Sequence, residues 1–380
     1  MTNKSCEETP ESALPIAIVG AGMAGLTLAN LLLERGFSIQ VFEKSRGTGG
    51  RMASRAPGAK TAAANESTQI PLDIGAQYFT ARDERFQQFL SRFKDAGHVS
   101  GWEANLRYVD SDGHWSEFQG SERFVGVPRM SSLTRQLRKD IDVRFGHRIT
   151  EMHVDKGAWW LSTDSDSQGT DHAFGPFRAV LLTAPAPQCK DLIDSIRGTE
   201  SPLLPVATTQ YLAQIGMRPG WTVALHFPEG AGLDYDGVQT RSDVFEWCVN
   251  NSSKPGRRPE QSSADSAGTS TPVDEWWVLQ ASAAWSESHL DCSGEFVLSS
   301  LTEQFRRLTG CRATVDASLY HLWRYARPKH SSVDHCHWIE EAGIGLAGDW
   351  LTGGRVEGAF LSGFALAEAV CHTHMRAFSE

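Results

Sequence analysis

Apolar and polar positions near the start of the chain predict a strand, a helix and a second strand. Residues 15–20 (PIAIVG) form a short β-branched run that is typical of a buried parallel strand, and residues 37–43 (FSIQVFE) form another. Between them, residues 21–36 (AGMAGLTLANLLLERG) predict a helix that stops at Gly36. The three elements together predict a βαβ unit.

The middle of the chain has a different pattern. Residues 221–227 and 275–285 carry bulky aromatic side chains and predict strands. Residues 84–97 and 293–310 repeat apolar positions at helical spacing and predict amphipathic helices. This mixture indicates a domain that differs from the βαβ style of the first residues.

The end of the chain returns to the style of its beginning. Residues 343–350 predict a strand that feeds a helix over 353–373, which is rich in small residues. We therefore predict an α/β fold with a doubly wound, Rossmann-like parallel-sheet domain built from both chain ends, and an inserted α+β domain on a mixed sheet. The predicted domains are a disordered tail over 1–13, a dinucleotide-binding domain over 14–83, 140–190 and 325–380, and a substrate domain over 84–139 and 191–324.

Three polar segments interrupt these patterns and predict mobile surface loops, at 56–69, 163–171 and 252–272. The chain is uncharged from Ala13 to Leu33, but this stretch contains Pro15 and three glycines and follows an acidic flank. It therefore predicts neither a membrane span nor a secretory signal.

Composition limits the classes of binding partner that are expected. The 380 residues carry a net charge of −10, and Lys and Arg form no block, so nucleic acid and anionic membranes are not expected partners. Seven dispersed cysteines without a CxxC pair indicate reduced thiols in the cytoplasm and no structural zinc site. The HCHW stretch at 335–338 looks metal-like, but adjacent residues rarely converge on one ion, so we expect a loop without metal there.

The first chemical motif is GAGMAG at residues 20–25, which fits G-x-G-x-x-G between a strand and a helix. Gly20 permits a tight turn, Gly22 lets backbone approach a diphosphate, and Gly25 lets helix and strand pack closely. Free N–H groups at the helix start, around Met23 and Ala24, favour the diphosphate. Glu43 ends the second strand, where it can accept hydrogen bonds from a ribose.

These features fit NAD and FAD equally well, and a second cluster helps to separate them. Lys44, Arg46, Gly50 and Arg51 lie in KSRGTGGRM, just past the ribose acid, where an extended FAD would continue. Adjacent glycines permit close approach to phosphates, and Arg51 would supply positive charge. Taken alone, the cluster is equally well explained as a plain turn that needs glycine.

A resemblance joins these motifs. GAGMAG, FEKSRGTGGRM, LDIGAQYF at 72–79 and AGDWLTGGRVEGAFLSG at 347–363 are similar to the fingerprint of amine-oxidase-type flavoproteins. DIGAQYFTARD, WRYARP at 323–328 and the later motifs resemble bacterial renalase-like proteins in the same order. The similarity spans nearly the whole chain outside the tail and the polar segments, and it implies FAD on a glutathione-reductase-type domain. No residue gives a reason to assign a covalent flavin link, so non-covalent FAD is expected.

The resemblance also implies roles for single residues. Asp349 resembles the acid that meets the ribityl and phosphate region, and Val356 would aim its backbone N–H at the flavin N1/O2 edge. Ile149 resembles the strand residue that holds the adenine, and Ala326 would lie against FAD. An ordinary helix N-cap is a compatible reading of Asp349. Gln77 and Tyr78 complete the expected cofactor contacts.

The expected substrate contacts come from the loop over 77–82, from Gly220 and from the start of the flavin helix. They are Tyr78, Phe79, Thr80, Ala81, Arg82, Gly220 and Arg355, with Arg82 and Arg355 as candidates for binding anionic groups. Four tryptophans could line an aromatic pocket, although for each one core packing is the better interpretation: Trp221, Trp247, Trp285 and Trp323.

The resemblance implies an oxidase for 2- or 6-dihydro isomers of NAD(P), which passes hydride to flavin N5 and forms hydrogen peroxide from O2. It implies a homodimer as well. No catalytic acid–base pair is needed, since hydride transfer depends on alignment and desolvation. The alternatives are an amine or porphyrinogen oxidase of the same fold, and an NAD-binding dehydrogenase or a redox-sensing dinucleotide-binding protein without turnover.

Overall fold

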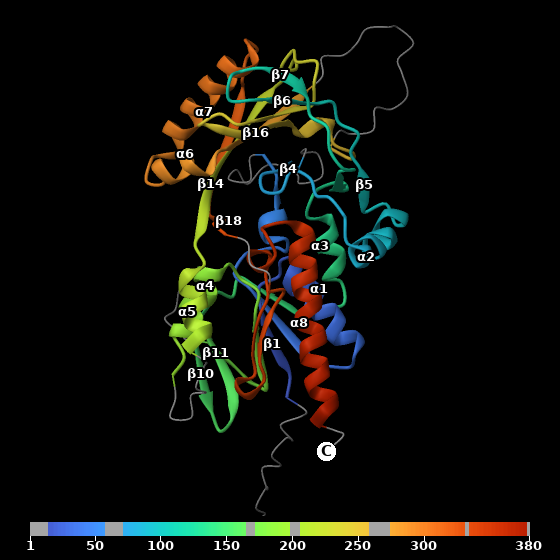
Figure 1. The fold of residues 1–380 in the computed structure, drawn as a ribbon, viewed down its shortest axis with the longest axis vertical. Helices are drawn as coiled ribbons and strands as arrows, with labels where there is room; N and C mark the ends of the chain where they lie inside the picture. Colours follow the sequence, from blue (N-terminus) through green and yellow to red (C-terminus); the bar gives the residue numbers. More distant parts are fainter. Residues whose placement is uncertain are drawn as a thin grey trace, which may run out of the picture. The chain divides into compact units, whose positions relative to one another are not determined.

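In the computed structural model, residues 14–57, 71–164, 172–197, 206–257, 274–330 and 334–377 are described. The predicted tail and most of the three polar segments lie outside them. The chain separates into two units, unit 1 over 1–50, 137–216 and 328–380, and unit 2 over 51–136 and 217–327 (Figure 1).

The boundaries differ from the predicted domains in two places. Residues 51–83 belong to unit 2 and residues 191–216 to unit 1. The first difference has a physical cause in Asp73, whose backbone and side chain bond to other segments of unit 2, as described below. A boundary drawn at residue 83 therefore falls too late in the chain.

Unit 1 is built on a six-stranded sheet in the order β19-β20-β13-β1-β2-β9. Neighbouring strands from β20 to β9 are parallel, and only the edge pair β19–β20 is antiparallel. Central strands are short runs of buried β-branched and leucine side chains, as expected of strands covered on both faces. The strands are β1 Ile16–Val19, β2 Ile39–Glu43, β9 Val143–Phe145, β13 Ala179–Leu182, β19 His337–Ile339 and β20 Ile344–Leu346.

Two helices from opposite ends of the sequence pack together in unit 1. Helix α1, Met23–Glu34, lies against α8, Val356–Ala377 (Figure 1). A Cβ at Gly363 would lie 2.3 Å from the carbonyl oxygen of Ala24, so the two backbones approach as closely as glycine allows. This contact joins the two ends of the chain in one domain, as the sequence predicted.

A three-stranded antiparallel sheet also packs in unit 1, in the order β10-β11-β12. Its strands are Ile149–Asp155, Ala158–Thr163 and Ala173–Phe177. Phe42 of β2 contacts the rings of Phe174 and Phe177, and Trp159 donates its indole N–H to the Ala342 carbonyl at 2.9 Å. A doubly wound sheet carries helices on both faces, so the sequence prediction missed this antiparallel layer. Helices α4, Ala186–Asp194, and α5, Val206–Gln214, complete the unit.

Unit 2 is built on a seven-stranded mixed sheet in the order β18-β14-β17-β16-β15-β6-β7. The mixture arises because β15 and β6 are parallel, while β14–β17, β17–β16, β16–β15 and β6–β7 are antiparallel. The strands are β6 Leu106–Val109, β7 Trp115–Glu117, β14 Met217–Phe227, β15 Gly237–Thr240, β16 Phe245–Asn250, β17 Glu275–Ala281 and β18 Ala317–Pro328.

Helices α6, Ala283–Ser288, and α7, Gly294–Thr309, pack on this sheet. Val297, Leu301 and Phe305 of α7 are buried among alternate residues of the strands, which is the core that the amphipathic pattern predicted. The prediction of a strand over 275–285 was wrong at its end. Ser282 accepts a hydrogen bond from the Trp285 amide and starts α6, a capping signal hidden behind the apolar run.

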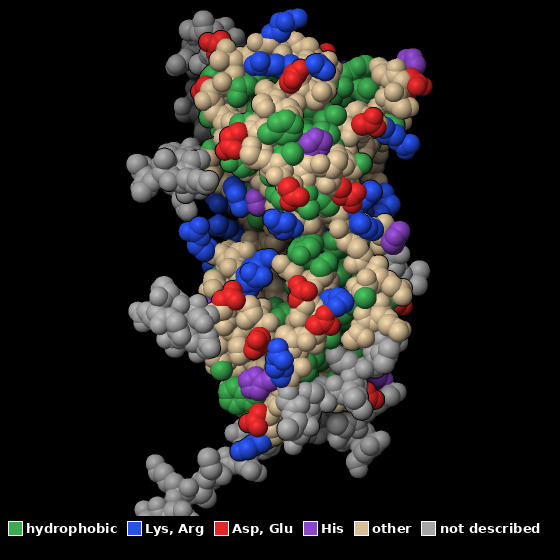
Figure 2. Space-filling model, turned by 90° about the vertical axis from the view of Figure 1, so that its left-hand side faces the viewer, with side chains coloured by type: hydrophobic (Ala, Val, Ile, Leu, Met, Phe, Trp, Pro, Cys, Tyr) green, Lys and Arg blue, Asp and Glu red, His purple; other side chains and the backbone are tan. Residues whose placement is uncertain are grey.

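Smaller elements of unit 2 carry its loops. They are β3 Ser54–Arg55, β4 Leu72–Asp73, α2 Glu84–Asp95, β5 Val99–Gly101, β8 Phe124–Gly126 and α3 Ser132–Leu137, of which Leu137 itself falls in unit 1. Both signs of charge occur over the face shown in Figure 2. Within the described residues, every helix is too short or too polar to cross a bilayer.

Candidate functional site

The glycine motif of unit 1 forms the turn between β1 and α1. Gly20 has φ +114°, and its amide donates to the Phe42 carbonyl at 2.8 Å. A Cβ at Gly25 would lie 2.1 Å from the Gly20 carbonyl oxygen, so the helix can approach the strand only with glycine there. The two glycines are therefore required by the turn itself, as the motif predicts.

Gly22 differs from its neighbours because its conformation is ordinary. It has φ −84° and caps α1 without any side-chain hydrogen bond, and a Cβ placed on it meets nothing within 4 Å. Open space thus faces the first N–H groups of α1, which include those of Met23 and Ala24. The fold itself therefore does not require glycine at position 22. A glycine beside free space at the start of a helix leaves room for a diphosphate to approach the backbone.

Thr183 supports this turn and was missed by the sequence reasoning. It follows β13, and its hydroxyl lies 3.0 Å from the Val19 carbonyl oxygen and 3.1 Å from that of Gly20. The same oxygen would be 2.6 Å from a Cβ at Gly25. Only the tertiary fold brings this residue next to the motif, and no spacing in the sequence marks it.

Glu43 ends β2 and is 7% exposed. One carboxylate oxygen accepts the Ala21 amide at 2.9 Å and the other accepts the Ser45 amide at 2.8 Å. Each oxygen has a second lone pair, so the acid can brace the glycine turn and still accept ribose hydroxyls. The ribose contact stays a prediction.

The second glycine cluster lies on the first. Gly49 donates its amide to the Ala21 carbonyl at 3.1 Å, and Gly50 has φ +53°, where a Cβ would lie 3.8 Å from the Gly22 Cα. Unit 1 thus brings the two clusters to one place, which a plain turn elsewhere would not do. Lys44 and Arg46 are exposed beside them, and burial around its amine lowers the pKa of Lys44.

The last helix of unit 1 begins near an acid. Asp349 is 6% exposed, and its carbonyl accepts the amides of Thr352 at 2.9 Å and Gly354 at 2.8 Å. These bonds form the turn that leads through the exposed Arg355 into α8, whose first residue is Val356. The site predicted for Asp349 and Val356 is therefore a helix start with an acid close in sequence, which is compatible with the role that the resemblance implies.

Ile149 lies outside the parallel sheet. It begins β10 of the antiparallel sheet and is 6% exposed. The chain reaches it from β9, and on the way His147 donates its amide to the Glu43 carbonyl at 3.0 Å. Ile149 therefore comes two residues after one that is bonded to the acid that the motif assigns to the ribose.

In unit 2, the loop over 73–82 holds most of the predicted substrate residues. Gln77 is 5% exposed, and its amide nitrogen donates to the carbonyls of Asp73 at 2.5 Å and Gly75 at 3.0 Å. Its side-chain oxygen accepts from the Lys254 amine at 3.0 Å. Both ends of the amide are thus bonded inside the unit, so the side chain braces the loop.

Asp73 is the centre of this bracing and was not predicted. Its Oδ2 lies 3.2 Å from Lys254 Nζ and 2.5 Å from an Arg257 nitrogen, and all three side chains are fully buried. The two cations and hydrogen bonds overcome burial and hold the pKa of Asp73 at about 2. Burial lowers the pKa of Lys254 to about 8, against the opposing effect of Asp73.

Lys254 and Arg257 correct the sequence interpretation of residues 252–257 as part of a mobile loop. Residues 252–257 are described, and Ser252, Lys254 and Arg257 are each at most 2% exposed. The two cationic side chains of this segment pair with the buried acid Asp73. The polar composition of the segment alone does not indicate this burial.

Other predicted contacts of the loop divide by exposure. Phe79 exchanges two backbone hydrogen bonds with Phe124 and packs on Phe86, so its side chain belongs to the core. Thr80 and Ala81 are partly buried, and Arg82 is exposed just before the start of α2. The substrate contact expected of Phe79 stays a prediction.

Three predicted residues meet at the edge of the large sheet. Arg51 donates to the Ala326 carbonyl at 3.2 Å. A Cβ at Gly220 in β14 would lie 3.0 Å from the Cβ of Ala326 in β18, so the small residues let the strands pass closely. Unit 2 thus places Arg51, Gly220 and Ala326 together, although the sequence separates them widely.

The four tryptophans divide between core and sheet faces. Trp221 is in the helix-covered core and Trp285 packs against it, as the core interpretation expected. Trp247 instead contacts Tyr78 and Phe118, and Trp323 donates its indole N–H to the Ile74 carbonyl at 3.0 Å.

Tyr78 sits in an aromatic and charged setting. Its ring centroid lies 5.6 Å from that of Trp247 and 6.2 Å from that of Trp102. Burial raises the pKa of Tyr78, with nearby Arg123 and Arg327 opposing the shift and Glu246 supporting it. Arg327 forms an ion pair with Glu246.

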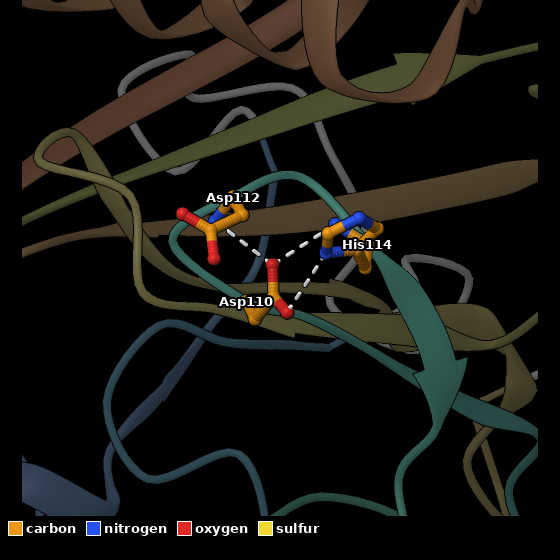
Figure 3. A group of neighbouring side chains, drawn as sticks. All are labelled: Asp110, Asp112 and His114. Atoms are coloured by element: carbon orange, nitrogen blue, oxygen red, sulfur yellow. Dashed lines mark hydrogen bonds and ion pairs between the residues drawn. The ribbon is translucent and has the colours of Figure 1, made fainter.

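One group of metal-type ligands occurs elsewhere in unit 2, at Asp110, Asp112 and His114 (Figure 3). Asp110 Oδ1 accepts the amides of Asp112 at 2.8 Å and His114 at 2.9 Å, and Oδ2 lies 3.3 Å from His114 Nδ1. The carboxylate therefore closes the exposed β6–β7 hairpin, and the turn accounts for the cluster without an ion.

Comparison with known proteins decides the family. Residues 101–371 match the model of the flavin containing amine oxidoreductases, and residues 18–93 match an NAD(P)-binding Rossmann-like domain. The chain belongs to the flavin containing amine oxidoreductase family. This membership and the dinucleotide-binding domain make FAD the cofactor of this flavoprotein.

Solved structures of the same fold cover nearly the whole chain. A protein assigned as a protoporphyrinogen oxidase from Exiguobacterium sp. 255-15 has a TM-score of 0.69 at 12% identity, covering 94% of this chain and 99% of its own. Cyclohexylamine oxidase from Brevibacterium oxydans has a TM-score of 0.65 at 10% identity, with 95% and 99% covered. Putrescine oxidase bound to putrescine has 0.61 at 12% identity, with 94% and 99% covered. At these identities the likeness shows the fold alone.

The residues present fit FAD. Unit 1 offers open space at Gly22, the buried acid Glu43 and a second glycine cluster packed on the first. The extended cofactor needs phosphate contacts beyond the first turn, and the Gly49–Gly50 cluster is placed for them.

Proposed function

We propose that this flavoprotein is an oxidase of 2- or 6-dihydro-NAD(P) that releases NAD(P)+ and hydrogen peroxide. Bound FAD would supply the hydride acceptor at N5, and O2 would restore it. The proposal starts from the renalase-like order of the motifs and goes beyond the family, whose members act on several substrate classes.

The charge around Tyr78 is the observation that carries the choice of substrate. The Arg123 guanidinium carbon lies 5.7 Å from the centre of the Tyr78 ring. Aromatic faces that bind a substrate ammonium must be free of other cations, and this ring already has one. Arg327 lies nearby as well, but its charge is balanced by Glu246. An anionic dinucleotide is favoured over an alkylamine in such surroundings.

The residues around Tyr78 also suit the proposed hydride transfer. Loss of hydride from a dihydropyridine leaves an aromatic ring and needs alignment more than a base. Tyr78 and Trp247 provide edge-to-face aromatic surfaces, with an interplanar angle of 82°. Glu246 is engaged with Arg327 and is not needed as a proton acceptor.

A porphyrinogen oxidase is the second candidate, since porphyrinogens bear carboxylates that the arginines would also favour. The test is anaerobic mixing of the FAD-loaded protein with the 2- and 6-dihydro isomers, ordinary NADH, protoporphyrinogen, putrescine and cyclohexylamine. We expect the isomers alone to bleach the visible flavin absorbance rapidly, and O2 to restore it with one hydrogen peroxide per turnover. Bleaching by amines or porphyrinogen instead would reject the proposal, and bleaching by none would favour a redox sensor.

A further inference from the structure

Arg123 is a partly buried cation in unit 2 without an acidic partner. It lies just before β8, and one of its terminal nitrogens is 3.4 Å from the Phe118 carbonyl oxygen. Among the described residues, no carboxylate lies within the 4.0 Å that defines an ion pair with it, whereas the neighbouring Arg327 is paired with Glu246. A guanidinium that is partly removed from water and lacks a counter-ion favours an anionic ligand.

The guanidinium is also held in one orientation. Its central carbon lies 5.0 Å from the centre of the Phe118 ring and 5.7 Å from that of Tyr78, and it hydrogen-bonds to the Tyr78 side chain. Two rings and a hydroxyl fix the planar group before any ligand arrives. Fixing it in advance reduces the entropy lost on binding, so the favourable interaction with an anion is retained.

Arg123 lines a cavity of about 850 Å³ on unit 2. Trp102, Ser253 and Pro255 form part of the wall, and Glu103 and Glu122 line it as well. Lys94 lies 3.9 Å from the Glu122 carboxylate and offsets part of its charge. The lining therefore combines one fixed cation with carboxylates, which would repel a bare polyanion but can accept hydroxyl groups.

We propose that this cavity, the Arg123 cavity, binds the part of the dinucleotide substrate beyond its reacting ring. Arg123 binds the diphosphate, and Glu103 and Glu122 accept hydrogen bonds from ribose hydroxyls, as acids do in dinucleotide sites. A dinucleotide carries a diphosphate between two riboses, and the lining of the cavity includes a group for the diphosphate and groups for the hydroxyls. This inference rests on the proposed function and replaces Arg82 as the candidate anion contact.

The kinetic test pairs substrate truncation with removal of the arginine. The FAD-loaded protein and its Arg123→Met variant are compared on a dihydro-NAD isomer and on the matching isomer of 1-methyl-dihydronicotinamide, which has no phosphate. We expect KM for the dinucleotide to rise roughly ten- to a hundred-fold, the range of a charge-assisted hydrogen bond, with KM for the truncated substrate unchanged. Arg123→Lys should keep part of the affinity, and Arg85→Met, at an exposed ion pair, should change neither value.

A binding measurement separates this inference from the proposed function. Calorimetry with ADP-ribose should show binding to the FAD-loaded protein that weakens at least ten-fold in Arg123→Met and also weakens in Glu103→Ala, which removes the acceptor for a ribose hydroxyl. Equal affinity in the protein and in Arg123→Met would overturn the inference, as would inorganic pyrophosphate binding as tightly as ADP-ribose. Failure of every dihydronicotinamide to bleach the flavin would instead reject the proposed function, and calorimetry would still decide the cavity.

Discussion

At the scale of single residues, Asp73 shows how far a buried charge can control a loop. It holds Lys254 and Arg257 with its carboxylate, accepts the Met130 amide at 3.0 Å, and has its own amide bonded to Asn251 at 3.1 Å. Gln77 joins through Lys254. The loop that carries Tyr78 is therefore positioned by charges that lie about 180 residues further along the chain, a distance over which no sequence pattern operates.

Replacing Asp73 by Asn should destabilise the protein by roughly 3–5 kcal/mol at pH 7, because two buried cations lose their shared carboxylate. The pKa of this acid is lowered from 3.8 to about 2 on folding. Its contribution is thus fully present above 3.8 and is lost as the pH falls toward 2, so the difference between protein and variant should shrink over that window. Urea unfolding at several pH values measures it.

The control for this substitution is Asp83→Asn. Asp83 caps α2 near the surface, where the loss of a cap or exposed ion pair costs about 1 kcal/mol. Equal losses at both positions, or a difference that does not depend on pH, would mean that Asp73 is not the buried centre of the cluster.

At the scale of the elements, the turn before α1 separates glycines that the fold requires from one that it does not. Gly22→Val should leave the free energy of unfolding of the cofactor-free protein within about 1 kcal/mol, since its Cβ meets nothing within 4 Å. The same side chain would fill the space at the helix start, so the flavin content of the purified variant should fall sharply.

Gly47→Val provides the comparison, because Gly47 is exposed and a Cβ there also meets nothing within 4 Å. It should keep its flavin, as judged by the ratio of visible to ultraviolet absorbance. If both variants retained full flavin, the open space at Gly22 would have no part in binding the cofactor.

The start of α8 allows an equally direct test. Val356 is the first residue of the helix, a position that tolerates proline, yet Val356→Pro removes the backbone N–H assigned to the flavin N1/O2 edge. The reduction potential of the bound flavin should fall by roughly 30–60 mV, the equivalent of one hydrogen bond to a charged group in a two-electron couple. A dye-linked reductive titration measures the shift.

Val356→Ala is the matched control, since it removes the side chain and keeps the N–H. It should leave the potential unchanged. A similar shift in both variants would assign the effect to packing of the side chain and not to the amide.

The predictability of the elements follows the range of the interactions that make them. The βαβ unit, α2, α7 and α8 were predicted because apolar periodicity and glycine positions are local. The end of β17 and the antiparallel sheet β10–β12 were missed or misread, because Ser282 caps a helix inside an apolar run and the sheet is specified by contacts such as Phe42 with Phe174. Local patterns show none of these contacts.

At the scale of the whole molecule, the motifs indicated the cofactor but not the substrate wall. The glycine spacing and the acid at the end of the second strand indicate FAD, because a tight turn beside a phosphate restricts which residue types can occur there. The wall around Tyr78 comes from four separate stretches of unit 2, which contribute Trp102, Arg123, Trp247 and Arg327. Charge totals mislead here too, because a chain of net charge −10 gathers two arginines beside one tyrosine.

The interleaving of the two units has a consequence for biosynthesis. The chain passes between the units at residues 50, 136, 216 and 327, and α1 of unit 1 packs on α8, whose residues are translated more than 300 positions later. During translation, the glycine turn and α1 are therefore made well before α8, the helix that packs on α1. We therefore expect flavin loading to follow synthesis of nearly the entire polypeptide, and a chain cut short before α8 to purify without flavin.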